Sequence, residues 1–186
     1  MKKRIIIGIS GASGAIYGKR ALELLQDTDI ETHLVVSKAA ELTMQSENIG
    51  SSKDIAALAD VTHKVSDIGA SIASGSFKTM GMIIAPCSVK TMGEIATGVT
   101  SSLMSRAADV CLKERRKLVL MVRETPLHYG HLTTMTHLTQ MGAIINPPVP
   151  HFYSNLKDID DMVTQSIARV LDLFDIDVQA LRRYKD

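Results

Sequence analysis

A glycine-rich turn near the start of the chain is the feature most suggestive of chemistry. A β-branched run over residues 4–9 breaks into Gly11, Ala12, Ser13 and Gly14, and a helical pattern follows at once. Small side chains let a ligand approach the backbone, and a helix N-terminus offers partial positive charge and unpaired N–H groups. We therefore expect a phosphorylated ligand here. The alternative is a turn that only packs a helix on a strand.

The spacing of the glycines in this turn narrows the choice of ligand. Glycines recur at every third position from Gly8 to Gly14, which is not the G-x-G-x-x-G of dinucleotide sites, and no P-loop motif occurs. The next buried run ends at Ser37, where an NAD site has a carboxylate for the ribose. Hydroxyls from Ser13 and Ser37 suit the single phosphate and the ribityl chain of FMN better than a carboxylate would.

Two later strand ends also carry polar side chains. Ser88 and Thr91 follow the third buried run, and Arg123 and Glu124 follow the fourth. Ligands of open α/β sheets lie beyond the carboxyl ends of the strands, so we expect these junctions to share one crevice with the first turn. Arg123 would pair with a phosphate or a reduced flavin anion, and Glu124 would act as a general acid or base. The alternative is an Arg–Glu pair that only caps the strand.

Three further cations lie on predicted helices. Arg106 and Lys113 are seven residues apart, so they project from nearly the same side of their helix and suit a phosphate or diphosphate. Arg169 lies away from the apolar stripe of the last helix. For all three, the alternative is a solvated surface position.

Metal and thiol chemistry are not indicated. The spacing of His128, His131 and His137 matches no zinc pattern, so we expect no metal and interpret these histidines as solvated or capping residues near a helix start. Cys87 and Cys111 have the surroundings of packed, reduced thiols, which favours the cytosol.

Composition excludes several classes of protein. The 186 residues suit one domain with its own core, and a formal net charge of +1 favours neither nucleic acid nor an anionic membrane. No apolar run approaches the ~20 residues that span a bilayer. Aromatic residues are only 4% of the chain, with no Trp. Any stabilisation of a carbocation by a π surface would therefore have to come from a bound cofactor.

Strand-like and helical runs alternate along the chain, which predicts an α/β sandwich of three layers around a parallel sheet. We expect strands at 4–9, 33–36, 82–85, 118–122 and 143–145, with a short one near 62–65. Helices are expected at 15–26, 38–45, 53–58, 90–97, 102–114, 132–141 and 159–174.

Five motifs make the chain similar to a known family. They are G-I-S-G-A-S-G-A-I-Y-G, V-S-K-A-A, A-P-C-S-V-K-T, L-K-E-R-R-K-L-V-L-M-V-R-E-T-P-L and P-P-V-P-H-F-Y. They resemble the UbiX-type flavin prenyltransferases, including the branch associated with phenylacrylic acid decarboxylase, in order and over nearly the whole chain.

The resemblance implies a Rossmann-like, flavodoxin-related fold in a single FMN-binding domain over residues 1–186. It implies transfer of a dimethylallyl group from dimethylallyl phosphate to N5 and C6 of reduced FMN, without a metal. The product, prenylated FMN, would serve a UbiD-type decarboxylase, and the chain would assemble as a homo-dodecamer.

The resemblance also implies roles for individual residues. FMN contacts would fall on Gly11, Ala12, Ser13, Ser37, Ser88, Val89, Lys90, Thr91 and Arg123, and contacts to the prenyl phosphate on Arg106, Lys113, Tyr153 and Arg169. Glu47 and Glu124 would be active-site carboxylates, and Ser13 and Glu124 would relay protons. One departure is Tyr184, which stands where the family often has a tryptophan.

Two rival functions stay open. One is an FMN-dependent decarboxylase of cysteine-like substrates, although residues 147–152 lack that group's P-x-M-N-x-x-M-W signature. The other is a non-catalytic protein that carries flavin to a partner.

Overall fold

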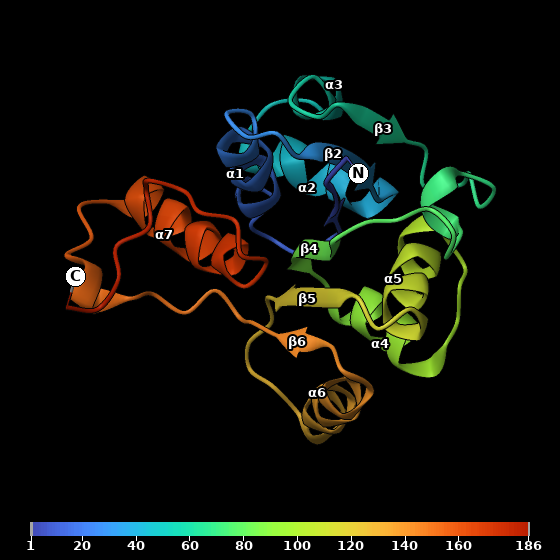
Figure 1. Ribbon diagram of the computed structural model, residues 1–186. Coiled ribbons are helices and arrows are strands. Elements are labelled where there is room, and N and C mark those ends of the chain that lie inside the picture. Colours follow the sequence, from blue (N-terminus) through green and yellow to red (C-terminus); the bar gives the residue numbers. More distant parts are fainter. Residues whose placement is uncertain (1, 186) are drawn as a thin grey trace.

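The computed structural model describes residues 2–185 and has a six-stranded parallel sheet at its centre (Figure 1). Its strands are β1 (Arg4–Ile9), β2 (Glu31–Val36), β3 (Val61–His63), β4 (Gly81–Cys87), β5 (Lys117–Val122) and β6 (Ile144–Ile145). They are arranged in the order β3-β2-β1-β4-β5-β6, which is the order of a doubly wound Rossmann sheet. The predicted α/β class and parallel sheet are confirmed.

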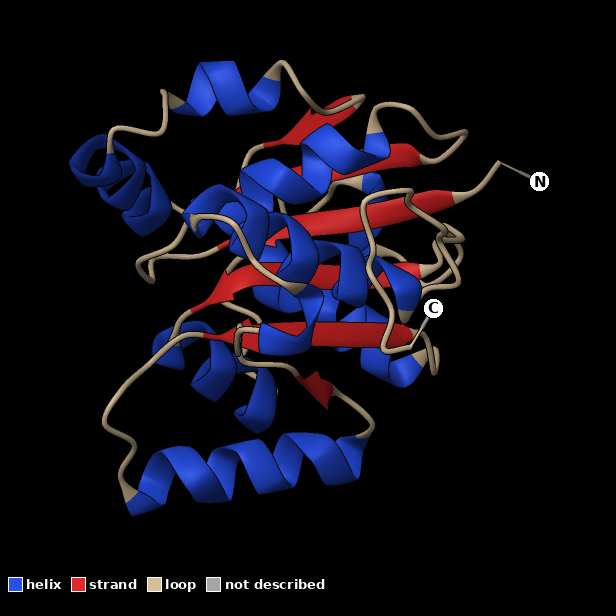
Figure 2. Cartoon of the chain, turned by 90° about the vertical axis from the view of Figure 1, so that its left-hand side faces the viewer, coloured by secondary structure: helices blue, strands red, loops and turns tan. Residues whose placement is uncertain are grey.

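Helices cover both faces of this sheet (Figure 2). They are α1 (Ile16–Leu25), α2 (Lys38–Glu47), α3 (Ser52–Ala56), α4 (Val89–Thr97), α5 (Leu103–Lys113), α6 (Tyr129–Met141) and α7 (Ile159–Asp172), with short 3-10 turns η1 (Ser71–Ala73) and η2 (Phe152–Ser154). Helices α1, α2, α3 and α7 pack in one core layer, and α4, α5 and α6 in the other.

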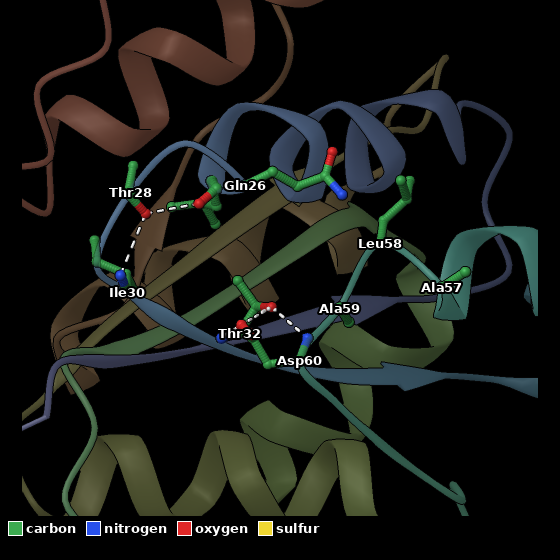
Figure 3. Close-up of a pocket in the computed structure, with 9 residues that line it drawn as sticks. Gln26, Thr28, Ile30, Thr32, Ala57, Leu58, Ala59 and Asp60 are labelled. Atoms are coloured by element: carbon green, nitrogen blue, oxygen red, sulfur yellow. Dashed lines mark hydrogen bonds between the residues drawn. The ribbon is translucent and has the colours of Figure 1, made fainter.

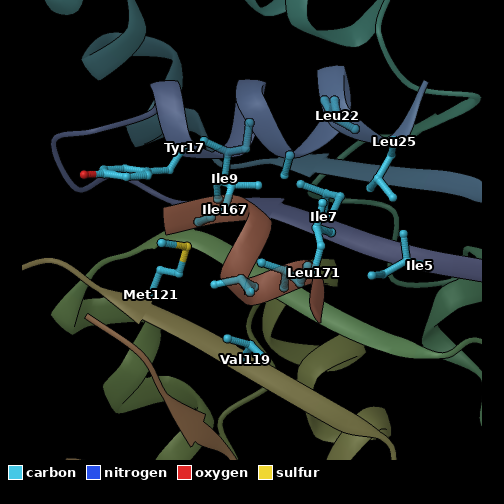
Figure 4. Packing of buried hydrophobic residues seen from close by; sticks show 14 of the residues in the cluster. Ile5, Ile7, Ile9, Tyr17, Leu22, Leu25, Val119, Met121, Ile167 and Leu171 are labelled. Atoms are coloured by element: carbon cyan, nitrogen blue, oxygen red, sulfur yellow. The ribbon is translucent and has the colours of Figure 1, made fainter. Parts of the chain in front are cut away.

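The side-chain alternation of β1 shows why two layers form. Ile5, Ile7 and Ile9 point into the layer of α1 and α7, where Leu22 and Leu171 meet them (Figure 4). The side chain between them, that of Ile6, joins the other layer. Successive residues of a strand face opposite sides, so a continuous apolar run is what a sheet covered on both faces requires.

The observed boundaries differ slightly from the predicted ones. Strand β2 begins at Glu31, two residues early, because the side chain of Thr32 and that of Asp60 bond each other's backbone N–H groups and bring the start of the strand into the sheet. Helix α6 begins at Tyr129 because the His128 side chain caps it by accepting from the Gly130 N–H at 3.0 Å. That bond confirms the expected capping role of a histidine at this helix start.

Candidate functional site

The strand order reverses between β1 and β4, which is where open α/β sheets bind ligands. Ser10 joins the two strand ends at this point. Its buried hydroxyl donates to the Pro86 carbonyl at 2.9 Å and accepts from the Ser88 N–H at 2.7 Å. The first and second junctions expected from the sequence are therefore held side by side.

A hollow of about 420 Å³ opens beside this reversal. Gly11, Ser37, Ser88, Lys90 and Thr91 lie among the residues that line it. Ser37 is the N-cap of α2 and accepts from Ala40 N–H at 3.1 Å, while Ser88 is the N-cap of α4 and accepts from Thr91 N–H at 3.3 Å. Two helix N-termini and their hydroxyls thus border one cavity, which is an arrangement that suits a phosphate and a polyol chain.

The N-terminus of α1 is already occupied by a carboxylate. Glu47, at the end of α2, accepts from the Gly14 N–H at 2.6 Å and from the Ala15 N–H at 3.0 Å. A carboxylate at this position is favoured by the helix dipole. Two of the N–H groups expected to hold a ligand phosphate therefore hold Glu47, and the N-termini of α2 and α4 are the ones that border the hollow.

The two glycines of the first turn are required by close contacts. A Cβ at Gly11 would lie 2.4 Å from the Cβ of Ala39, and Gly14 has a φ of +98° with the Arg123 side chain 3.1 Å from where its Cβ would be. The turn therefore fits closely against α2 and against the end of β5, and Ala12 and Ser13 between the glycines stay accessible to a ligand.

A second hollow, of about 450 Å³, lies beyond the end of β5. Tyr17, Arg123, Glu124, Pro148 and Met162 are among its lining residues. Within residues 2–185, the guanidinium of Arg123 makes no hydrogen bond or ion pair, although it lies near Tyr17. The Glu124 carboxylate accepts from the neighbouring Thr125 N–H at 3.0 Å and from no other group of the described residues. An unpaired cation and a carboxylate are thus presented to the cavity.

Tyr17 stays protonated in this setting. Burial raises the pKa of its hydroxyl, and the positive charge of Arg123 opposes that rise. The ring packs in the core layer, and Figure 4 shows its hydroxyl pointing outward. The side chain therefore offers a hydrogen-bond donor at the edge of the cavity.

The proline segment 147–150 leads from this hollow to a group of aromatic side chains. The ring of His151 stacks on Tyr153 with centroids 5.8 Å apart, and Tyr184 meets Tyr153 edge-on at 5.5 Å. The pKa of His151 is lowered by burial and by the nearby charge of Arg169. Arg169 itself is bonded to Asp172 at 2.8 Å. Tyr153 and Arg169, both predicted to bind the prenyl phosphate, therefore lie in one neighbourhood.

The other two predicted phosphate ligands are held elsewhere in this chain. Arg106 donates to Asp109 at 2.7 Å and to the Ala73 carbonyl at 3.2 Å, and Lys113 is bonded to Glu114 near the far end of α5. Neither lines the two hollows described above. Their predicted role therefore requires a second subunit and stays a prediction.

A third hollow, of about 240 Å³, lies near the starts of β2 and β3, at the amino ends of these strands (Figure 3). Its main polar groups satisfy each other: Asp60 accepts from the backbone N–H and the hydroxyl of Thr32 at 2.7 and 2.9 Å. No reactive pair faces it, and we assign it no chemistry.

The described residues do not point to metal or thiol chemistry. Residues 2–185 contain no group of three or more His, Cys, Asp or Glu side chains placed to share a metal ion. Cys87 is fully buried, and burial raises the pKa of its thiol to about 12, as expected of a packed thiol. Among the same residues, no helix has the length and apolar character needed to cross a membrane.

Two residues that shape the site were not predicted: Ser10, which joins the ends of β1 and β4, and Tyr17, which lines the second hollow. Ser10 was part of the first motif given above. Its hydrogen bonds to Pro86 and Ser88, far along the chain, cannot be inferred from a local sequence pattern. Tyr17 lies on the apolar stripe of α1, where a core role is the ordinary expectation. The position of this tyrosine in the first turn of α1, next to the glycine-rich turn, was the one sign in the sequence that its hydroxyl could reach the site.

Known proteins of the same architecture identify the family. The Flavoprotein family matches residues 1–175. The flavin prenyltransferase UbiX of Escherichia coli (strain K12) is 59% identical over 175 residues, which cover 94% of this chain and 93% of that protein. This chain belongs to the UbiX family of flavin prenyltransferases.

Solved structures of the UbiX family agree with the fold. The crystal structure of AnUbiX (PadA1) in complex with FMN and dimethylallyl pyrophosphate has a TM-score of 0.97 and 46% identity, and covers 100% of this chain and 99% of that one. A dodecameric FMN-dependent UbiX-like decarboxylase from Escherichia coli O157:H7 has a TM-score of 0.95 and 46% identity, with 98% and 100% coverage.

Proposed function

We propose that this protein transfers a dimethylallyl group from dimethylallyl phosphate to reduced FMN, and that prenylated FMN is its product. The observation that carries the proposal is the pair of hollows beyond the carboxyl ends of the strands. One is bordered by hydroxyls and helix N-termini, and the other by a free arginine and a carboxylate. Membership of the UbiX family supports the same reaction.

FMN is the acceptor substrate in this proposal. Gly11, Ala12, Ser13 and Ser37 would receive it from the side of β1 and β2, and Ser88, Val89, Lys90 and Thr91 from the side of β4. The residues present fit such a ligand, because the hollow is rimmed by hydroxyls and N–H groups and a Cβ at Gly11 would already crowd it. Arg123 would lie at the flavin ring and stabilise negative charge of its reduced form.

The allylic substrate would occupy the hollow beyond β5. Its C–O bond breaks, phosphate leaves with the bonding electrons, and the allyl carbon bonds to N5 of the flavin, which gives up its proton. Ring closure would then break the C2=C3 double bond of the allyl group: C2 takes up a proton, C3 bonds to C6 of the flavin, and C6 gives up its own proton. Arg169 and Tyr153 would bind the departing phosphate, and cations placed there stabilise the charge that develops. Ser13 and Glu124 would carry the protons, and Glu47 would be a second carboxylate of the active site.

We propose that the active form is a homo-oligomer, with a dodecamer as the expected size. The UbiX-like relative described as dodecameric has nearly the same fold. Arg106 and Lys113 line neither hollow of their own chain, so assembly would let a neighbouring subunit supply them to the phosphate. A UbiD-type decarboxylase as recipient of the product, a single domain and a cytosolic location remain further parts of this proposal.

Release of inorganic phosphate tests the chemistry. Protein with dithionite-reduced FMN, dimethylallyl phosphate and EDTA should release phosphate, and omission of FMN should stop it. Glu124→Gln should lower the rate by ~100-fold or more, as expected when a general acid–base is lost. Lys53→Ala, on the exposed α3, should match wild type. Phosphate release that needs a divalent metal would contradict the proposal.

A non-catalytic carrier would behave differently. Arg169→Ala would then leave the activation of an apo UbiD-type decarboxylase intact, whereas a prenyltransferase would lose it. Dimethylallyl diphosphate belongs in the same experiment, because the AnUbiX structure contains the diphosphate. We expect the monophosphate to be the better donor, since the resemblance to the family implies dimethylallyl phosphate as the substrate.

A further inference from the structure

We propose that Gln165 and Arg182 form a clasp that fastens the C-terminal tail, residues 173–185, and thereby positions Tyr153 and Arg169 for the allylic substrate. The inference rests on the proposed function, because it takes these two residues as ligands of the substrate phosphate. Gln165 and Arg182 are then positioning residues rather than catalytic ones.

Gln165 has an unusual environment for a glutamine. It lies in α7 with only 1% of its surface exposed. Its side-chain Nε2 donates to the Ala180 carbonyl at 2.6 Å, and its Oε1 accepts from the Arg182 N–H at 3.0 Å. Buried amides are kept where their polar atoms find partners, and here both partners are backbone atoms of the tail. This one side chain therefore fixes the path of residues 180–182 across α7.

Arg182 makes the second half of the clasp. Its Nη1 donates to the Ser154 carbonyl at 2.5 Å, and its Nη2 donates to Asp161 Oδ1 at 2.5 Å. Ser154 ends η2, the turn that carries Tyr153, and Asp161 lies in the first turn of α7. The guanidinium thus ties tail, turn and helix together with charge-assisted hydrogen bonds, which are stronger than neutral ones.

The residues after Arg182 reach the predicted substrate ligands. Arg183 bonds Asp172 Oδ1 at 2.5 Å, and the other oxygen of that carboxylate accepts from Arg169 at 2.8 Å. Tyr184 packs edge-on against Tyr153. In Figure 1 the tail turns after α7 and runs back along this helix toward the helix's N-terminal end. A displaced tail would therefore change the surroundings of both substrate ligands.

The exposure of the aromatic rings indicates that the clasp positions Tyr153, in addition to stabilising the fold. Tyr153 is 54% exposed and Tyr184 is 67% exposed, so neither ring is held by a packed core. The residues that line the hollow at the ends of β1, β2 and β4 include none of the tail. Loss of the clasp should therefore weaken binding of the allylic substrate and leave FMN binding unchanged.

The test replaces Gln165 by leucine, which has similar volume and no hydrogen-bonding group, in the full chain. Gln179→Leu is the matched control, because Gln179 is an exposed glutamine of the same tail. We expect the KM for dimethylallyl phosphate to rise about tenfold in Q165L, with kcat and the Kd for FMN within about twofold of wild type. Q179L should match wild type in all three.

Trypsin gives a readout that does not depend on activity. Cleavage after Arg182 and Arg183 should be faster in Q165L than in wild type or Q179L, because these sites lose their fixed path. If Q165L does not fold, Arg182→Gln enters the kinetic and FMN-binding assays, since this half-buried side chain is not part of the core. Its trypsin cleavage is followed after Arg183 alone, because the substitution removes the site at Arg182.

The outcomes separate the two proposals. An unchanged KM in Q165L, with or without faster cleavage, would overturn the clasp as a positioning device, and so would an equal loss of FMN binding. Wild-type protein that releases no phosphate from dimethylallyl phosphate would instead refute the proposed function, whatever the trypsin result.

Discussion

Gly11 shows how single atoms determine the flavin site. Its position has no room for a Cβ, because Ala39 of α2 would lie 2.4 Å away. Such a distance forces the turn after β1 and the start of α2 apart. These are the two segments that present Ser13 and Ser37, so a change of one methyl group acts directly on the predicted ligand contacts.

We therefore expect Gly11→Ala to weaken FMN binding by about tenfold or more, a loss of ~1.4 kcal/mol. Titration of FMN followed by quenching of its fluorescence measures this. Gly93→Ala is the matched control, because a Cβ there meets nothing within 4 Å and alanine stabilises a helix interior by up to ~1 kcal/mol. Equal affinities of G11A and G93A would contradict this reading of the turn.

Glu47 supports a second prediction at this scale. Glu47→Ala leaves the N–H groups of Gly14 and Ala15 without their carboxylate, a loss of ~1 kcal/mol that lowers Tm by about 2–4 °C in a chain of this length. Glu47→Gln, which keeps one acceptor oxygen, should lower Tm by less than Glu47→Ala does. Thermal unfolding compares both with Gln45→Ala, an exposed change on the same helix. A Tm of E47A equal to that of Q45A would show that the carboxylate does not cap α1.

At the scale of elements, the edge strand β3 is joined to β2 by a pair of imidazoles. His33 Nδ1 lies 2.9 Å from His63 Nε2, and His33 Nε2 lies 3.0 Å from Glu31 Oε1. Burial and the neighbouring His33 lower the pKa of His63, while Asp67 opposes this. The ring of Phe77 packs edge-on against His33. The junction is thus built for a neutral His63.

This junction predicts that stability falls in acid. Because the folded pKa of His63 lies below the unfolded value of about 6.5, the unfolded chain binds more protons as pH falls through that range. The free energy of unfolding, from urea titrations, should therefore decrease from pH 7.5 to 5.5. His63→Gln should flatten that decrease, and His137→Gln, an exposed change on α6, should not. A slope that H63Q leaves intact would contradict the assignment.

At the scale of the whole molecule, α6 is the α-helix of residues 2–185 with the smallest share of buried residues. It has no Asp, Glu, Lys or Arg, only Leu138 is buried, and Leu132 is 49% exposed. Figure 2 shows it beyond the β6 edge of the sheet. In the proposed homo-oligomer, such an uncharged surface is suited to contact another copy of the chain.

Leu132→Glu should therefore lower the mass of the assembly measured by light scattering, because a charge would be buried in the contact. Thr62→Glu, at the β3 edge, provides the control and should leave the mass unchanged. The proposed contribution of Arg106 and Lys113 from a neighbour predicts that L132E also loses phosphate release. A full-size, fully active L132E would remove α6 from the interface.

The sheet, its two helical layers and the hydroxyl-bearing strand ends could be predicted from the sequence, because apolar runs followed by small polar residues are local patterns. The bond from Glu47 to Gly14 and the clasp of Gln165 could not, because each joins backbone and side chain across long stretches of chain. The positions of Arg106 and Lys113 in an assembly depend on a second subunit altogether.

The mass of the flavin is the most direct measurement of the central claim. The purified protein is incubated anaerobically with FMN, dithionite and dimethylallyl phosphate, and the extracted flavin is analysed by mass spectrometry. The account predicts FMN that has gained one dimethylallyl group in place of a proton, and no such gain without the allylic phosphate. FMN recovered with its original mass from folded protein with bound flavin would contradict it.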